Sequence, residues 1–188
     1  MTASTLESKF GHLAYAEAPE ASLRDAGAYR QTGRIVRLLP PAAEAWQRMA
    51  TAGAQAGVGL VPISGFRTHA YQGSLFAKAI VKYGSEADAA KWVAPAGFSE
   101  HHTGLAVDIG AESQLEDDAE TSFADTAESG WLLQHAAAFG FELSFPRDNV
   151  QGIAYEPWHW RFIGTAEARE VFARARLDRW DRRKSSPS

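Results

Sequence analysis

The sequence predicts an α+β domain, with a small and mostly antiparallel sheet flanked by helices. Segments with helical periodicity and short apolar segments typical of strands alternate along the chain, and Gly and Pro separate them. A chain of 188 residues without internal repeats is ordinary for one domain with a sizeable core. We therefore expect an N-terminal arm packed on the domain over 1–32, a main domain over 33–180 and a frayed tail over 181–188.

The first half of the chain contains two predicted helices and one predicted strand. Residues 1–32 have few periodic apolar positions, so we expect them to be irregular. A helix begins after Pro40 and Pro41 and ends at Gly57, because proline suits a first helical turn and glycine ends one. Residues 60–63 predict a short buried strand, and a second helix follows from 69 to about 82.

The second half predicts shorter elements. Between them lie a loop at 94–100, an acidic surface excursion at 111–126 and a turn-rich loop at 146–152. The predicted elements are strands at 105–109, 141–145 and 158–162, a helix at 126–139 that ends at Gly140, and a final helix capped by Thr165.

Composition excludes several classes of protein and site. The net charge of -4 disfavours a nucleic-acid binder, which carries a basic field to pair with phosphate. Without cysteine, a transition-metal site must use His, Asp or Glu. No apolar run approaches the roughly 20 residues that span a bilayer, and no signal peptide is visible. We therefore expect a cytoplasmic location for the chain as it stands, or an exported or periplasmic one if a signal peptide has been removed.

Three residues have the types and spacing of a metal site. His101 lies in a predicted loop and Asp108 in the strand that follows, with Gly104 between them to allow a tight turn. His159, from another strand, completes the three protein ligands that a catalytic zinc uses beside one open position. Glu156 lies three residues before His159, where it could act as a general base. Arg67 could bind an oxyanion or a substrate carboxylate.

Each of these residues also has a structural interpretation. A histidine between two tryptophans is often simply packed, Glu156 could begin a turn, and Arg67 could be a solvated loop residue. Asp108 is more informative, because a carboxylate in a core strand is unfavourable unless it is paired or bound to metal. We expect His102 to point away from the site, and we treat the remaining histidines as structural or surface residues: His12, His69 and His135.

Three motifs together resemble a known family. The pattern Ser-x-His-x-x-Gly-x-Ala-x-Asp begins at Ser99, and Glu-Pro-Trp-His begins at Glu156. Ser-Gly-Phe-Arg ends at Arg67, and Gln72 follows five residues later. These strings resemble the VanY-type D-alanyl-D-alanine carboxypeptidases, in the group named for lysostaphin, D-Ala-D-Ala peptidases and hedgehog. The resemblance covers roughly residues 60–164.

The resemblance implies a role for each matching residue. It implies a small α+β domain around an antiparallel sheet, with one Zn²⁺ per chain in a cleft on one face. Glu156 would be the catalytic base, and Arg67 would steady the scissile carbonyl. The implied zinc ligands are His101, Asp108 and His159, and the expected substrate-binding residues are Arg67, Gln72, Ser99, Tyr155 and Trp158.

The chain departs from the family pattern at two places outside the metal set. Many relatives carry Arg-Tyr-Pro before the last motif, where this chain has Ser144, Phe145 and Pro146. If that arginine helps to bind a substrate carboxylate, specificity differs here. His102 stands where some relatives have Gln.

The expected function is a zinc carboxypeptidase that removes the C-terminal D-alanine of peptidoglycan stem peptides or their precursors. An L,D-carboxypeptidase on tetrapeptide stems, a dipeptidase and a peptidoglycan endopeptidase remain alternatives, because the motifs build the reaction centre and not the cleft walls. A catalytically silent module that binds cell-wall peptides is a different class, and the presence of Glu156 and Arg67 disfavours it. A structural zinc site is disfavoured too, because such a site uses a fourth protein ligand.

Overall fold

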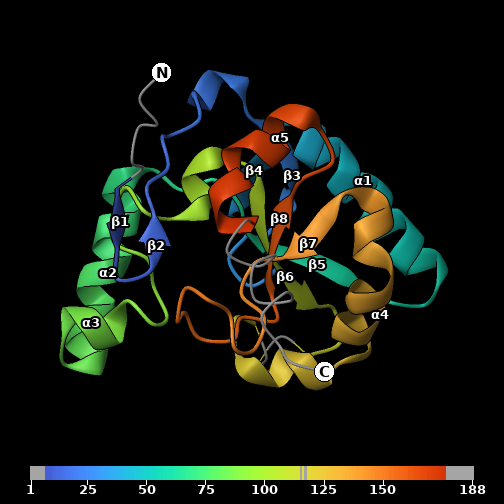
Figure 1. Cartoon of the computed structure of the whole chain (residues 1–188). Coiled ribbons are helices and arrows are strands. Elements are labelled where there is room, and N and C mark those ends of the chain that lie inside the picture. The colour runs from blue at the N-terminus through green and yellow to red at the C-terminus, as the bar shows by residue number, and fades with distance from the viewer. Residues whose placement is uncertain (1–6, 115, 117, 177–188) are drawn as a thin grey trace, which may run out of the picture.

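The central element of the fold is an antiparallel sheet whose strands differ in length. The computed structural model describes residues 7–114, 116 and 118–176. Within these residues the sheet has four strands in the order β5-β6-β8-β7, and every neighbouring pair is antiparallel. The predicted α+β class is confirmed (Figure 1). The strands are β5 (Leu60–Ser64), β6 (Ala106–Ala111), β8 (His159–Phe162) and β7 (Phe141–Leu143).

The register of β6 brings three distant segments together. All six residues of β6 are buried, and the strand pairs with a neighbour on each side. Asp108 lies opposite Ser64 of β5 and opposite His159 of β8. The segment that leads to Arg67 and the last histidine of the chain therefore meet beside Asp108.

Helices cover both sides of the sheet (Figure 1). Trp46 and Met49 of α1 belong to the same buried cluster as Val107 and Ile109 of the sheet. On the other side α2 packs against α3 through a smaller cluster around Phe76. Among the described residues, no helix is both long and apolar enough to cross a membrane. The helices are α1 (Pro40–Gln55), α2 (His69–Tyr83), α3 (Glu86–Ala89), α4 (Ala127–His135) and α5 (Ala166–Val171).

The helix ends follow from local side chains. Thr68, Thr126 and Thr165 each accept a hydrogen bond from a backbone N–H in the first turn of α2, α4 and α5. Gly84 ends α2 with a positive φ of 86°. The predicted helix over 126–139 is divided, since α4 ends at His135 and the tighter 3₁₀ turn η5 (Ala136–Phe139) follows. Further 3₁₀ turns are η1 (Glu20–Ser22), η2 (Glu100–Thr103) and η4 (Thr121–Asp125).

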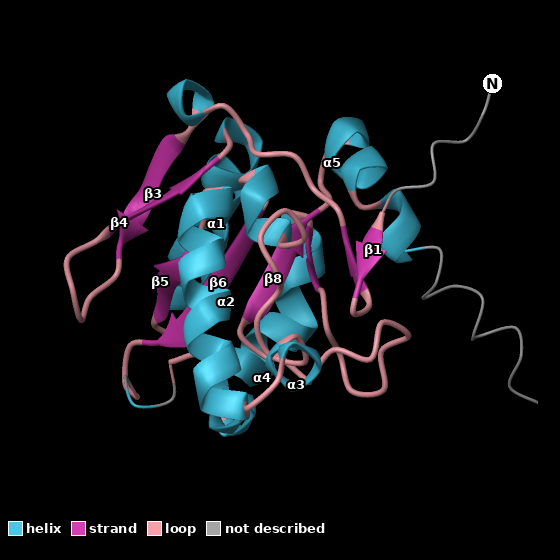
Figure 2. Ribbon diagram, turned by 90° about the vertical axis from the view of Figure 1, so that its left-hand side faces the viewer, coloured by secondary structure: helices cyan, strands magenta, loops and turns pink. Residues whose placement is uncertain are grey.

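The N-terminal segment is more regular than its sequence predicts. It contains the strands β1 (Ser8–Lys9), β2 (His12–Leu13) and β3 (Arg24–Ala28), and β3 pairs with β4 (Ile35–Leu38). Figure 2 shows β3 and β4 as a hairpin at one edge of the molecule. Ala26 is the one buried residue of β3, so the strand has no apolar alternation to detect. The predicted tail over 181–188 lies outside the described residues.

Two predicted strands differ at their ends. The strand predicted over 141–145 ends at Leu143, and the strand predicted from 158 begins at His159. Phe145 has left the ladder, and its carbonyl accepts from the Glu156 N–H at 3.2 Å. This contact places the segment before β8 against the segment after β7.

Candidate active site

Three short segments deliver the proposed metal ligands. His101 lies in η2, Asp108 in the middle of β6, and His159 at the first position of β8. Gly104 ends η2 with a positive φ of 65°, as the predicted tight turn requires. The chain turns there, and Asp108 comes to face His101 across the start of β6.

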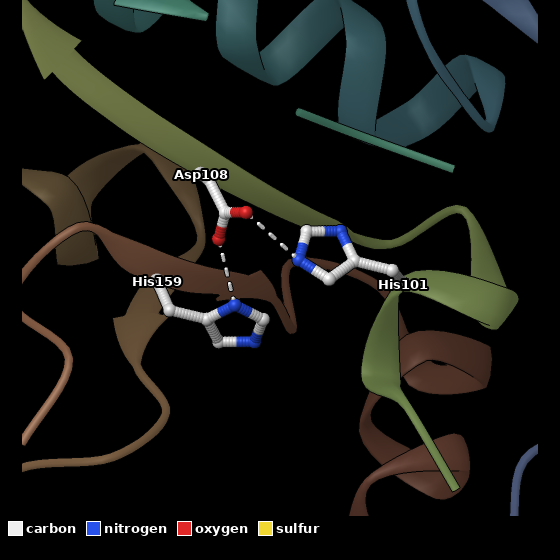
Figure 3. Close-up of side chains that lie close together, drawn as sticks. All are labelled: His101, Asp108 and His159. Carbon is white, nitrogen blue, oxygen red and sulfur yellow. Dashed lines mark hydrogen bonds and ion pairs between the residues drawn. The ribbon is translucent and has the colours of Figure 1, made fainter. Parts of the chain in front are cut away.

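The ligand atoms of these residues converge at one point. Nε2 of His101 lies 3.1 Å from Oδ2 of Asp108, and Nδ1 of His159 lies 2.9 Å from Oδ1. Figure 3 shows the two rings approaching the two oxygens of the carboxylate. In the part of the chain that the structure describes, these residues form a metal-compatible group whose ligand atoms all lie within 4.8 Å of one another. All three side chains are buried.

The second nitrogen of each histidine has its own acceptor. Nδ1 of His101 lies 2.6 Å from the Gly65 carbonyl oxygen, and Nε2 of His159 lies 3.0 Å from Glu100 Oε2. Each ring can donate through this outer nitrogen while its other nitrogen, which faces Asp108, binds a metal. Two imidazoles and one carboxylate with an open remaining position fit a catalytic divalent metal. The donor chemistry and the hydrogen bonds behind it are therefore compatible with zinc.

Glu156 is a buried carboxyl group beside this site. Its Oε2 lies 3.9 Å from Nδ1 of His159, and the residue is 7% exposed. Burial raises the pKa of Glu156 to about 8; the His159 charge opposes this shift and the Asp108 charge adds to it. A carboxyl with a raised pKa can take up and release a proton near neutral pH, as a general base and acid requires.

Arg67 lies against the other side of Asp108. Its guanidinium pairs with Oδ2 of Asp108, and its Nε donates to Ser64 Oγ at 2.9 Å. Burial alone would raise the pKa of Asp108, but the charges of His101 and Arg67 outweigh it and keep that pKa well below its usual range. Gln72 accepts from Arg67 at 3.4 Å and donates to the Ala94 carbonyl at 2.8 Å. Gln72 thus helps to fix the position of Arg67.

The segments that form this site lie within the part of the chain that matches a known protein family. The model of the VanY family, D-alanyl-D-alanine carboxypeptidase, matches residues 36–165. The chain belongs to the VanY family. The expected family and enzyme class are confirmed by this match.

Curated and solved relatives agree with the family match. The bifunctional D-Ala-D-Ala dipeptidase and carboxypeptidase VanXYC of Enterococcus gallinarum is 35% identical over 142 residues, which are 73% of each protein. Three further curated relatives match over 48%, 23% and 44% of their own lengths, so this chain spans less than half of each.

Two solved structures have the same fold. The LdcB LD-carboxypeptidase has a TM-score of 0.70 and 30% identity, over 84% of this chain and 73% of that one. A variant of the vancomycin resistance D,D-pentapeptidase VanY, in complex with Zn(II), has a TM-score of 0.64 and 24% identity, over 87% of this chain and 93% of that one. The second likeness supports the fold alone.

The cleft of this VanY-family chain encloses about 570 Å³ beside the sheet. Residues of α2, from Gln72 to Tyr83, form one wall, and β6, β8 and η2 contribute the residues around Asp108. Nearly all of the predicted site residues line it: Arg67, Gln72, Ser99, His101, Asp108, Glu156, Trp158 and His159.

Tyr155 lies outside this lining, contrary to its expected place. The Arg147 guanidinium lies 4.3 Å from the centre of the Tyr155 ring. Glu156 lines the cleft and Tyr155, the residue before it, does not.

His102 points away from the metal group, as expected. Its Nδ1 lies 2.7 Å from the Arg67 carbonyl oxygen, and its Nε2 accepts from the Gly97 N–H at 3.1 Å. Burial lowers the pKa of His102 to about 4. A neutral His102 therefore connects the backbone at Arg67 to the loop before η2.

Sequence reasoning gave no role to Glu100, although it lies inside the first motif. Glu100 is 4% exposed, and its carboxylate accepts from His159, Ser144 and Arg161. A charged residue beside a proposed ligand in a buried stretch is the signal that could have identified it. A second signal is Arg161, two residues after His159, because a buried arginine needs a carboxylate partner such as Glu100.

Proposed function

We propose that this chain is a zinc-dependent carboxypeptidase that removes the C-terminal D-alanine from peptidoglycan stem peptides or their precursors. The observation that carries the proposal is the meeting of the His101, Asp108 and His159 ligand atoms with buried Glu156 in one cleft. The VanY family match supports the D-alanyl-D-alanine specificity. The donor set of two imidazoles and one carboxylate supports zinc as the metal.

The roles of the chain's own groups follow from their positions. Zinc bound by the three ligands would supply a Lewis acid at the scissile carbonyl and acidify the attacking water. Glu156 accepts the proton of that water and passes it to the leaving amine, for which its raised pKa is suited. Arg67 stabilises the negative charge that develops on the carbonyl oxygen. Trp158 and Ser99 line the cleft in which the peptide lies.

An L,D-carboxypeptidase is the second candidate, and one observation favours it. The LdcB LD-carboxypeptidase matches this chain at 30% identity and a TM-score of 0.70. The two activities share the reaction centre and differ in the residue that precedes the terminal D-alanine. The substrate, and not the metal group, distinguishes them.

Mass spectrometry of stem peptides incubated with the purified protein tests the proposal. We expect a pentapeptide stem to lose one D-alanine, with the reaction abolished by a chelator and restored by zinc. Loss of D-alanine from a tetrapeptide stem alone would identify the L,D-carboxypeptidase. Cleavage of neither stem by a zinc-loaded protein would reject both carboxypeptidase activities and favour an endopeptidase or a binding module.

A further inference from the structure

A buried carboxylate lies behind His159, on the side opposite the metal group. In Figure 3 the second ring nitrogen of His159 is turned away from Asp108. That nitrogen, Nε2, lies 3.0 Å from Oε2 of Glu100. Glu100 directly precedes His101 in η2, so one short turn supplies both a ligand and this carboxylate.

The hydrogen bond to Glu100 determines which nitrogen of His159 can bind a metal. A carboxylate can only accept, so Nε2 must carry the proton in this pair. Nδ1 faces Asp108 Oδ1 at 2.9 Å, and a bound metal would take the place of the proton between these two atoms. We propose that Glu100 is a positioning residue that accepts from Nε2 of His159 and so keeps Nδ1 directed into the metal group. This inference rests on the proposed metal site.

Glu100 is itself held from the opposite direction. Arg161 donates to Oε1 of Glu100 at 2.8 Å through one terminal nitrogen and to Glu142 at 2.8 Å through Nε. Arg161 is 1% exposed and lies two residues after His159 on β8, so both side chains leave the same face of the strand. A buried ion pair of this kind fixes the carboxylate, because either partner alone would be an uncompensated charge.

Ser144 completes the set around Glu100. Its hydroxyl donates to Oε2 at 2.6 Å, the same oxygen that accepts from His159. Ser144 is the residue that stands where many relatives carry the arginine of Arg-Tyr-Pro. In this chain that position contributes to the hydrogen bonds behind the metal ligand and not to a charge in the cleft.

Zinc affinity and the Nε2–H resonance of His159 test the role of Glu100. Glu100→Gln keeps the shape of the side chain but cannot accept from both His159 and Arg161, since one of them then faces an amide N–H. We expect zinc affinity, measured by competition with a chromophoric chelator, to fall by about 10- to 100-fold. In the zinc-loaded protein we also expect the Nε2–H proton resonance of His159 to move upfield, because this N–H then loses its bond to a charged carboxylate.

Glu142→Gln is the matched control. This substitution alters the other carboxylate that binds Arg161 and leaves the contacts of His159 unchanged. Zinc affinity should therefore stay within about twofold of wild type, a much smaller loss than the one expected for Glu100→Gln. If Glu100→Gln does not fold, Ser144→Ala decides, because it removes one hydrogen bond from the same oxygen. We then expect a loss of zinc affinity of a few-fold and a smaller shift of the same Nε2–H resonance.

The outcomes separate this inference from the proposed function. Wild-type zinc affinity and an unchanged Nε2–H resonance in a folded Glu100→Gln, or in Ser144→Ala where the first variant does not fold, would overturn the role of Glu100 alone. Failure of the wild-type protein to bind zinc would overturn the proposed function together with this inference.

Discussion

At the residue scale, we expect Glu156 to take part in catalysis and not in metal binding. The carboxyl is buried and lies 3.9 Å from a ligand nitrogen of His159, yet it does not belong to the group of converging ligand atoms. We expect Glu156→Gln to keep zinc and to lower kcat by about 10²- to 10⁴-fold, because the amide cannot accept the proton of the attacking water. The measurement is kcat on the stem peptide that the wild type cleaves, with zinc content determined on the same sample.

Asp108→Asn is the control for that prediction. It changes a proposed ligand in the same isosteric way, so both zinc content and turnover should fall. Turnover by Glu156→Gln at the wild-type rate would remove Glu156 from the mechanism. Loss of zinc from that variant would instead make it a ligand.

At the scale of elements, the approach of β4 to the end of β5 shapes the site. A Cβ on Gly65 would lie 2.4 Å from the Arg37 carbonyl oxygen and 2.9 Å from Cγ1 of Val36, both on β4. The Gly65 carbonyl is also the acceptor for His101 Nδ1. Glycine therefore permits the close contact that places this acceptor.

Gly65→Ala should destabilise the protein and weaken its metal site together. The added methyl group meets backbone, which cannot move aside as a flexible side chain can, so we expect a loss of about 1–3 kcal/mol in the free energy of unfolding. Urea unfolding and zinc competition measure the two effects. Gly73→Ala is the control, since its Cβ would meet only the Ala96 Cβ, at 3.7 Å, and alanine favours a helix. Equal unfolding midpoints for Gly65→Ala and wild type would contradict the prediction.

The same elements explain what the sequence could and could not predict. The helices at 40–55 and 69–83 were predictable because apolar residues repeat along one face between clear stop signals. The spacing of His101, Asp108 and His159 identified a metal group, but their convergence depends on strand register, which no residue pattern expresses. Glu100 was not predicted, because its role arises only when β8 brings His159 and Arg161 against it.

At the scale of the whole molecule, the N-terminal segment packs against the active-site elements. Nε2 of His12, in β2, lies 2.7 Å from the Ala90 carbonyl oxygen just beyond α3. His12 also lines the cleft and meets the Phe145 ring edge-on, with ring centres 6.3 Å apart. One buried histidine thus links the start of the chain to both walls of the site.

Burial lowers the pKa of His12 below its ordinary value of 6.5, although the Ala90 carbonyl and the Glu100 charge oppose the shift and the His159 charge adds to it. The unfolded chain therefore binds more protons than the folded chain at acid pH. The stability due to His12 is fully present above about pH 6.5 and is lost as pH falls below it. His12→Gln should show a smaller loss of stability between pH 7.5 and pH 5 than the wild type.

Urea unfolding of the chelator-treated proteins at the two pH values measures this difference without a contribution from metal release. The exposed His135 provides the control, because His135→Gln removes a histidine that does not line the cleft. An equal loss in His12→Gln and in the wild type would mean that protonation of His12 does not couple the N-terminal strands to the fold. A smaller loss would identify His12 as one source of acid sensitivity in the contact between the N-terminal segment and the cleft.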